Sequence, residues 1–381
     1  MLIASTYGMA RFGVGLFAPR LVLERPALAR VVGFAAAAQF VSYAVAAAVA
    51  ARLVHRRPGT GLVLAGLTAT AGCIGVAAVS TPLAFLAAVF VGGMGAGFAS
   101  PSMVRVVDCA VSGRAAPTAQ SMVNAGTSVG VMAVGGLAFA TTSTAGPWLL
   151  MAVACAASAG AVLLVTRGGS GMPAARDAET STASATGQGG RLVVPGLAAL
   201  VVGAGSALIW TFGPLLASEA GLVDAGRVGW LWIALGVGGL LGPLTGVVVG
   251  RLGPRGGWRL FAGVLALANV VLAVAIGLGV SWAAFTAMAI FGGGYMCLSG
   301  VLILWARAAW PTAAGAGTSV LFIALAVGQA LGSAGFEVAR SMAGPMGTVL
   351  SAAALCAIGG GVSRLPALGH EAATGATSVE A

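Results

Sequence analysis

The stretch RGGSGMPAARDAETSTASATGQGGR, residues 167–191, divides the chain into two long apolar parts. It consists of small and polar residues with a few charges, and it has no apolar run that could bury a core. Such a composition is typical of a flexible linker. We therefore expect two units of similar length, residues 1–166 and 192–364, joined by a linker on the cytoplasmic side and followed by a disordered tail over residues 365–381.

Apolar segments recur on both sides of this linker, at lengths near the ~20 residues that span a bilayer as an α-helix. Six precede it, at residues 2–19, 31–51, 61–79, 83–103, 119–140 and 147–165. Six follow it, at residues 192–216, 228–249, 260–278, 283–304, 315–336 and 346–361. Only 7% of the residues are charged, against roughly 25% in a soluble domain. The pattern predicts an all-α membrane protein with twelve transmembrane helices.

The basic residues indicate how the chain is oriented. All 19 of them are Arg, and their scatter gives the net charge of +10 without a basic run or motif that would bind nucleic acid. With both termini in the cytoplasm, thirteen arginines fall on the inner side and five on the outer, namely Arg20, Arg25, Arg30, Arg227 and Arg340. The positive-inside rule favours this topology. We expect a multi-pass protein of the bacterial cytoplasmic membrane.

The two halves share short matches in the same order. ARLVHR from Ala51 aligns with GRLGPR from Gly250, and FVGG from Phe90 aligns with FGGG from Phe291. AGTSV from Ala125 occurs again from Ala316. Internal repeats of this kind are common in transporters, so the matches predict two pseudo-symmetric six-helix bundles.

The loops after the second and eighth segments resemble the signature of the major facilitator superfamily, G-x-x-x-D-R-x-G-R-R. In GVVVGRLGPR the matching residues are Gly246, Arg251, Gly253 and Arg255, and Gly250 stands in place of the Asp. In the first half, ARLVHRRPG keeps Arg52, Arg56 and Arg57, with Ala51 in place of the Asp and His55 in place of an Arg. The resemblance implies gating loops, whose arginines could bind carbonyls or acids in one conformation and release them in the other. The alternative is that they only anchor the topology.

The resemblance also implies a fold and a function. Members of this superfamily place two six-helix bundles around a central cavity and move a small solute by alternating access. GGMGAG from Gly92 and NAGTSVGVMAVGG from Asn124 partly resemble motifs of drug-efflux branches. We therefore expect a secondary transporter that exports a drug or metabolite, working as a monomer.

Arg11 is the strongest candidate for a binding residue. It lies within the first apolar segment, where an Arg costs at least ~2.5–3.5 kcal/mol unless it has a partner or faces water. It could clamp an anionic substrate or serve in coupling, which makes uptake of a small anionic metabolite the alternative function. It could also be structural, bonded to helix carbonyls or reaching the interface.

Seven further polar or aromatic residues lie within the expected helices and should face inward, because a polar group in lipid needs a partner. They are Tyr7, Gln39, Tyr43, Asn124, Trp210, Tyr295 and Gln329. Each could contact a substrate or merely bond a neighbouring helix. Four tryptophans near segment ends are typical of interfacial anchors: Trp230, Trp232, Trp282 and Trp305.

The acidic residues limit the mechanism. None falls in mid-membrane, and Glu337 is expected to pair with Arg340 one turn further along. Whether transport is coupled to a proton is therefore left open by the sequence. Two histidines, no metal-ligand cluster and no phosphate loop argue against an enzyme, a metal or a cofactor. A membrane receptor that does not transport is the alternative from another class.

Overall fold

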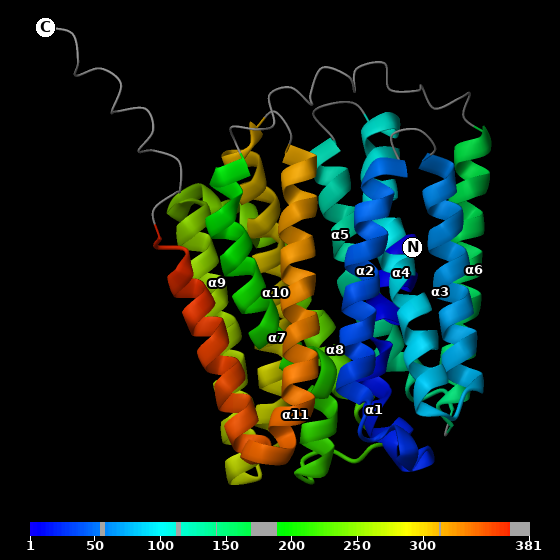
Figure 1. Cartoon of the computed structure of the whole chain (residues 1–381), viewed down its shortest axis with the longest axis vertical. Coiled ribbons are helices and arrows are strands. Elements are labelled where there is room, and N and C mark those ends of the chain that lie inside the picture. Colours follow the sequence, from blue (N-terminus) through cyan, green and yellow to red (C-terminus); the bar gives the residue numbers. More distant parts are fainter. Residues whose placement is uncertain (54–57, 112–115, 142, 169–188, 312–313, 366–381) are drawn as a thin grey trace, which may run out of the picture.

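The computed structural model describes residues 1–53, 58–111, 116–141, 143–168, 189–311 and 314–365, and these form helices and turns without a strand. The helices run nearly parallel in two groups, one from each half of the chain (Figure 1). Most of the expected linker and tail, together with His55 and Arg56, lies outside the described residues. The all-α membrane fold expected from the sequence is confirmed.

The first half has six spans. The first combines a π-helical segment, η1 (Ala4–Arg11), with α1 (Gly13–Glu24), and a short turn of 3-10 helix, η2 (Pro26–Leu28), follows it. The other five are α2 (Val32–Leu53), α3 (Pro58–Ala78), α4 (Pro82–Ala110), α5 (Ala116–Leu137) and α6 (Ala145–Gly168). The helix α4 continues well past the expected end at residue 103, since hydropathy marks the part of a helix in lipid rather than the end of the helix.

The second half begins with η3 (Gly189–Leu192). It continues through α7 (Val193–Glu219), α8 (Gly229–Gly239), η4 (Gly242–Leu244), α9 (Thr245–Leu278), α10 (Ser281–Ala309) and α11 (Ala314–Val362). Both α9 and α11 contain a kink, at Gly253 and Gly344, where φ is 70° and 66° and a proline follows. A positive φ suits glycine, and proline lacks the N–H that would continue the helix, so each kink separates two spans.

Counted in this way, the described residues form the expected twelve spans. Eight helical stretches meet the length and hydropathy of a membrane span, and two of them, residues 229–278 and α11, contain two spans each. The first span is divided between η1 and α1, and residues 122–137 of α5 form an apolar stretch shorter than 18 residues, so these two spans are absent from the eight.

The ends of the helices define two faces of the bundle. We call the end where α6 stops and η3 starts the linker face, which is uppermost in Figure 1, and the end where α1 stops and α2 starts the opposite face. The two halves meet where α2 packs on α11, α5 on α8 and α1 on α7. Small residues line these contacts and allow the helix axes to come close.

Candidate functional site

Arg11 lies between the two halves, at the last residue of η1. Only 1% of its surface is exposed. Its guanidinium carbon is 3.9 Å from the ring centre of Tyr43 and 4.4 Å from that of Tyr7, and the rings of Phe12 and Phe40 are both at 5.2 Å. Contacts of this kind stabilise a buried cation without neutralising its charge.

A short chain of hydrogen bonds joins Arg11 to the second half. Its Nη2 donates to Oε1 of Gln329 on α11 at 3.3 Å. The amide nitrogen of Gln329 in turn donates to the hydroxyl of Tyr295 on α10 at 3.0 Å. Both side chains are buried, where polar groups need partners. The structure therefore brings three of the expected site residues together from opposite halves.

Aromatic rings surround this chain on the side of the second half. The ring of Trp210 on α7 stacks on Phe12, with 3.7 Å between ring centres, and meets Tyr295 edge-on at 5.1 Å. Trp232 and Phe291 also meet Trp210 edge-on, at 5.9 and 5.5 Å. Trp232 was expected at the membrane interface, and that expectation is wrong, since this side chain is fully buried. Hydropathy near a helix end cannot separate an anchor from a core residue.

The other interfacial tryptophans divide in the same way. Trp305 is also buried, at 6% exposure, and packs beside Trp258, so its assignment as an anchor is wrong as well. Trp230 and Trp282 are exposed, as an anchor would be.

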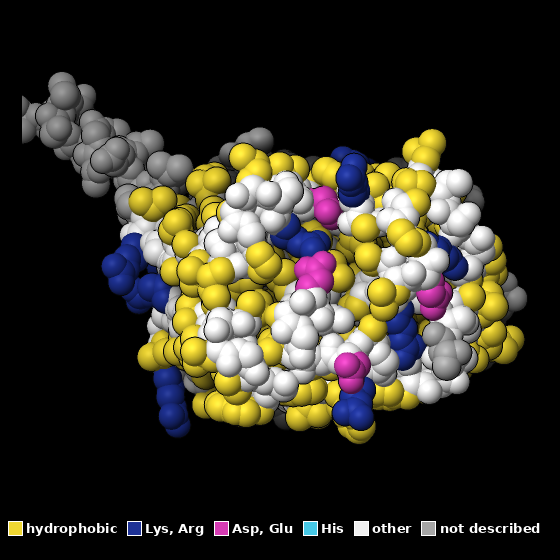
Figure 2. Space-filling view, turned by 90° about the horizontal axis from the view of Figure 1, so that it is seen from below, with side chains coloured by type: hydrophobic (Ala, Val, Ile, Leu, Met, Phe, Trp, Pro, Cys, Tyr) yellow, Lys and Arg dark blue, Asp and Glu magenta, His cyan; other side chains and the backbone are white. Residues whose placement is uncertain are grey.

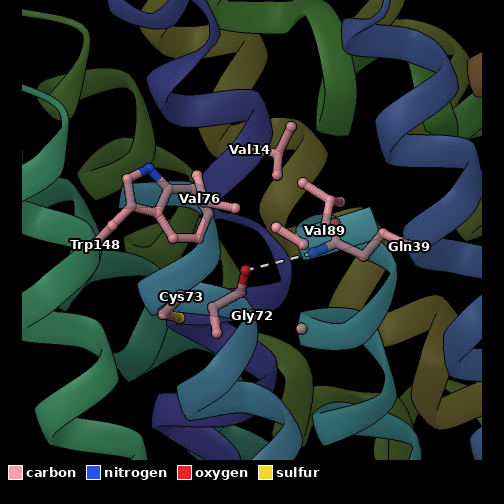
Figure 3. Close-up of a pocket in the computed structure, with 10 residues that line it drawn as sticks. Val14, Gln39, Gly72, Cys73, Val76, Val89 and Trp148 are labelled. Atoms are coloured by element: carbon pink, nitrogen blue, oxygen red, sulfur yellow. Dashed lines mark hydrogen bonds between the residues drawn. The ribbon is translucent and has the colours of Figure 1, made fainter. Parts of the chain in front are cut away.

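Two of the expected cavity residues lie apart from this cluster. Gln39 on α2 turns toward the first helix, where its Nε2 donates to the carbonyl of Ala10 at 3.5 Å. It borders a small, mostly apolar pocket inside the first half, lined also by Val14, Cys73 and Trp148 (Figure 3). Asn124 is exposed on α5, on the same helix face as Ser128 and Gly135, which pack against α8 of the other half, so its role in the cavity stays a prediction.

The charge of Arg11 has no acidic partner. The one ion pair formed by the described residues joins Arg340 to Glu219, so no carboxylate neutralises this guanidinium. Its Nε and Nη1 are buried and make no hydrogen bond. The Nε1 of Trp210, whose ring stacks on Phe12, is also buried without an acceptor. Buried donors of this kind are costly, and one that carries a full charge is the costliest.

The described residues of the two gating loops lie at the linker face. Arg52 is exposed at the end of α2, and Arg251 and Arg255 are exposed on either side of the kink at Gly253. Gly246 and Gly250 have no neighbour close to the position of a β-carbon. Among the described residues, these arginines make no hydrogen bond to the other half, so their gating role stays a prediction.

The opposite face carries contacts that the sequence did not reveal. Arg20, which is 9% exposed, donates to the carbonyl of Thr141 at 3.0 Å and to those of Ala225 and Gly226 at 3.2 Å. These carbonyls belong to both halves. Figure 2 views this face and shows basic and acidic side chains side by side at several points. Nothing in the spacing of Arg20 distinguished it from a topology signal.

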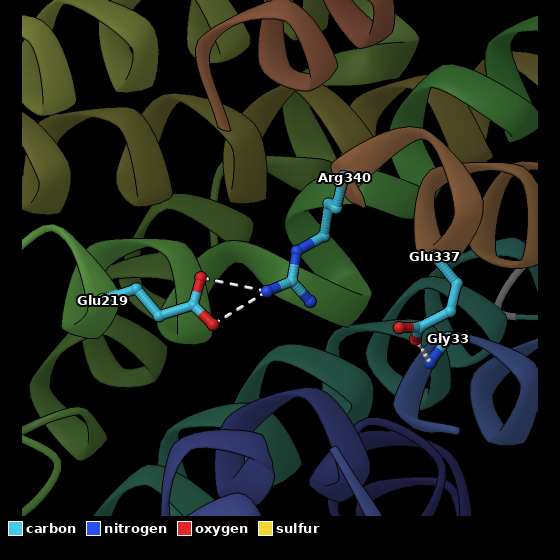
Figure 4. A network of polar contacts seen from close by, with 4 residues as sticks. All are labelled: Gly33, Glu219, Glu337 and Arg340. Atoms are coloured by element: carbon cyan, nitrogen blue, oxygen red, sulfur yellow. Dashed lines mark hydrogen bonds and ion pairs between the residues drawn. The ribbon is translucent and has the colours of Figure 1, made fainter. Parts of the chain in front are cut away.

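Glu337 and Arg340 do not pair with each other, so that expectation is wrong. Arg340 donates to both carboxylate oxygens of Glu219 on α7, at 2.8 and 2.9 Å (Figure 4). The carboxylate of Glu337 instead accepts a hydrogen bond from the backbone N–H of Gly33, in the first turn of α2. The N–H groups of a first turn have no partner within their helix and attract a negative charge, which the prediction from i to i+3 spacing ignored.

Comparisons with known proteins agree on the fold. The model of the family described as Major Facilitator Superfamily matches residues 1–333. Among solved structures, the D-xylose-proton symporter superposes with a TM-score of 0.76 at 14% identity, covering 96% of this chain and 97% of that one. A mutant of the nucleoside transporter NupG gives 0.71 at 12%, covering 95% and 97%. The xylose transporter XylE from E. coli, in a partially occluded inward-open conformation, gives 0.71 at 14%, covering 94% and 95%. No curated protein matches the sequence.

Proposed function

Because this chain belongs to the major facilitator superfamily, and is therefore a secondary transporter rather than an enzyme, we propose that its substrate is a small organic anion bound by Arg11. The observation that supports this is the guanidinium itself. It is buried between the two halves, it lacks a carboxylate partner among the described residues, and its Nε and Nη1 make no hydrogen bond. A carboxylate or phosphate supplies the charge and the acceptors that are missing.

The position of Arg11 suits alternating access. It lies on the first helix, and its neighbours Trp210, Tyr295 and Gln329 lie on the helices of the other half. A solute bound there contacts both halves at once. When the halves rock about it, each face of the membrane gains access in turn.

A second candidate is export of a neutral lipophilic compound, such as a drug or metabolite. The rings of Phe12, Trp210, Phe291 and Tyr295 favour it, since stacked and edge-on aromatic surfaces bind planar apolar molecules. In this case Arg11 would only hold the site together through Gln329. The two candidates differ in whether the charge of Arg11 is needed for binding.

We also propose that the linker face is cytoplasmic and that the protein resides in a bacterial cytoplasmic membrane. The positive-inside bias of the arginines supports this orientation. Exposed arginines of the linker face, such as Arg52, Arg251, Arg255 and Arg307, agree with it.

A thermal-shift screen tests the substrate class. The purified protein is heated with a panel of carboxylates and phosphorylated metabolites, and with neutral lipophilic drugs, because a ligand of the folded state raises the melting temperature. The variants are Arg11→Gln and, as a matched control, Arg30→Gln, which removes an exposed arginine of the opposite face.

We expect anions to stabilise the wild type and Arg30→Gln. Arg11→Gln should bind them about ten- to hundredfold more weakly, because hydrogen bonds to a charged group contribute roughly 1.5–3 kcal/mol. Stabilisation by neutral drugs alone, equal in Arg11→Gln, would instead establish the second candidate.

A further inference from the structure

Tyr7 covers Arg11 on the side of the linker face. The first span starts within the bundle and runs toward the opposite face (Figure 1), so Tyr7, four residues before Arg11, is closer to the linker face than Arg11 is. Its ring centre lies 4.4 Å from the guanidinium carbon. It also meets the rings of Phe12 and Tyr43 edge-on, both at 5.7 Å. A solute arriving from the linker face therefore meets Tyr7 before it can reach the charge.

Tyr7 differs from the other members of the site in its surroundings. Arg11, Tyr43, Trp210 and Tyr295 are all at least 96% buried, whereas Tyr7 is only half-buried. It packs at the margin of all three hydrophobic clusters of the molecule. A side chain at such a margin can leave without opening a cavity inside one core, so its movement costs less than that of its buried neighbours.

The backbone that carries Tyr7 is unusual. Residues Ala4–Arg11 form a π-helix, with hydrogen bonds from i to i+5, and regular α-helix follows from Gly13. Helices of this type are rare, generally short and often found at functional sites. The hydroxyls of Ser5 and Thr6 both donate to the carbonyl of Leu2, at 3.1 and 2.8 Å. Such local bonds compete with α-helical bonding and favour the irregular segment.

Resting on the proposed binding role of Arg11, we propose that Tyr7 is the gate of the site toward the linker face, and that η1 opens it by converting from π-helix to α-helix. The conversion replaces bonds from i to i+5 by bonds from i to i+4. Four residues fall short of a full turn in the π-helix and exceed it by about 40° in the α-helix, so the conversion shifts the Tyr7 ring sideways from its place over the guanidinium, while both residues stay on one face of the helix. Closing returns the ring to its cation–π contact, which shields the charge while the site is empty.

Chemical labelling of Arg11 tests this gate without any substrate. The full-length protein in lipid nanodiscs is treated with phenylglyoxal, which modifies accessible arginines, and the rate at Arg11 is followed by mass spectrometry. The exposed Arg52 serves as the internal reference. Three variants are compared with the wild type: Tyr7→Ala, which removes the ring; Tyr7→Phe, which keeps it; and the pair Ser5→Ala with Thr6→Ala, which keeps Tyr7 but removes both hydroxyls in favour of the best α-helix former.

We expect the Arg11 rate, relative to Arg52, to rise about tenfold in Tyr7→Ala and to stay near the wild-type rate in Tyr7→Phe. It should also rise in the alanine pair. An unchanged rate in Tyr7→Ala would overturn the gate, and an unchanged rate in the alanine pair would overturn the helix conversion. Should Tyr7→Ala not fold, the alanine pair still tests the proposal.

The labelling experiment and the thermal-shift screen test separate claims, so either claim can be overturned while the other stands. If labelling follows Tyr7 while no anion stabilises the protein, the gate stands and the substrate class is wrong. If anions bind through Arg11 while labelling ignores Tyr7 and the alanine pair, the proposed function stands and the gate is wrong.

Discussion

The two faces of the bundle differ in how the halves are joined. The hydrogen bonds and ring contacts that described residues make between the halves lie at the level of Arg11 or on the side of the opposite face. There Arg20 reaches the loop after α7, and Glu337 reaches the start of α2. At the linker face Arg52, Arg251 and Arg255 of the gating loops are exposed. The halves are thus held together at the opposite face, while at the linker face the described arginines of the signature, Arg52, Arg251 and Arg255, make no hydrogen bond across the halves.

Two arginines of the opposite face, Arg20 and Arg25, differ in which half of the chain they bind. Arg20 and Arg25 were both expected as outer topology signals, yet both donate to three backbone carbonyls. Arg20 joins the two halves, whereas Arg25 binds the last carbonyls of α3 and stays within its own half. Replacing Arg20 should therefore weaken the contact between the halves, whereas replacing Arg25 should destabilise the first half alone.

The largest effect is expected for Arg20→Met. The variant leaves three carbonyls at the opposite face without a donor, which should cost about 3 kcal/mol and let the halves separate there. Spin labels at the exposed positions 30 and 227, one in each half, report the distance across this face when the native cysteines are replaced. We expect a lower melting temperature and a longer distance.

Arg25→Met is the matched control for this comparison. It should lower the melting temperature as well, because it uncaps α3, but it should leave the distance between the labels unchanged. An Arg20→Met protein with the wild-type distance would show that this residue does not join the halves.

A smaller effect is expected for Gly15→Ala, because a β-carbon there would overlap the carbonyl of Trp210. The overlap pushes α1 from α7 and should cost about 1–3 kcal/mol, again with a longer distance between the labels. Gly136→Ala is the control, since Gly136 has open space around it. It should be neutral or slightly stabilising, and a loss as large as that of Gly15→Ala would contradict the steric explanation.

The smallest effect is expected for Arg251→Gln alone. Since Arg251 is exposed in this conformation, the melting temperature and the label distance should both stay at wild-type values. The gating loops can be tested further in a double variant. If they close the linker face while the opposite face is open, adding Arg251→Gln to Gly15→Ala should reduce the population in which the opposite face is open. A double variant that behaves like Gly15→Ala would reduce this arginine to a topology anchor.

Some residues of the site could be predicted from the sequence. Arg11 was identified because a charge in an apolar segment needs compensation, and Gln329 and Tyr295 because polar groups in lipid turn inward. The pairing of Glu337 with Arg340 was wrong for a physical reason. Local spacing says which residues can meet along one helix, but not which face of that helix another helix covers, nor which backbone N–H groups a neighbour presents.

Composition and periodicity by themselves determined that this is an all-α membrane protein of twelve spans in two related halves, because the thickness of a bilayer sets the length and polarity of each span. Only the tertiary structure decided that Arg11 lies between rings from its own half and an amide from the other, that Trp232 and Trp305 are buried, and that Arg20 joins the halves. These outcomes depend on contacts between residues up to hundreds of positions apart, and such contacts follow from how the helices pack, which no local pattern encodes.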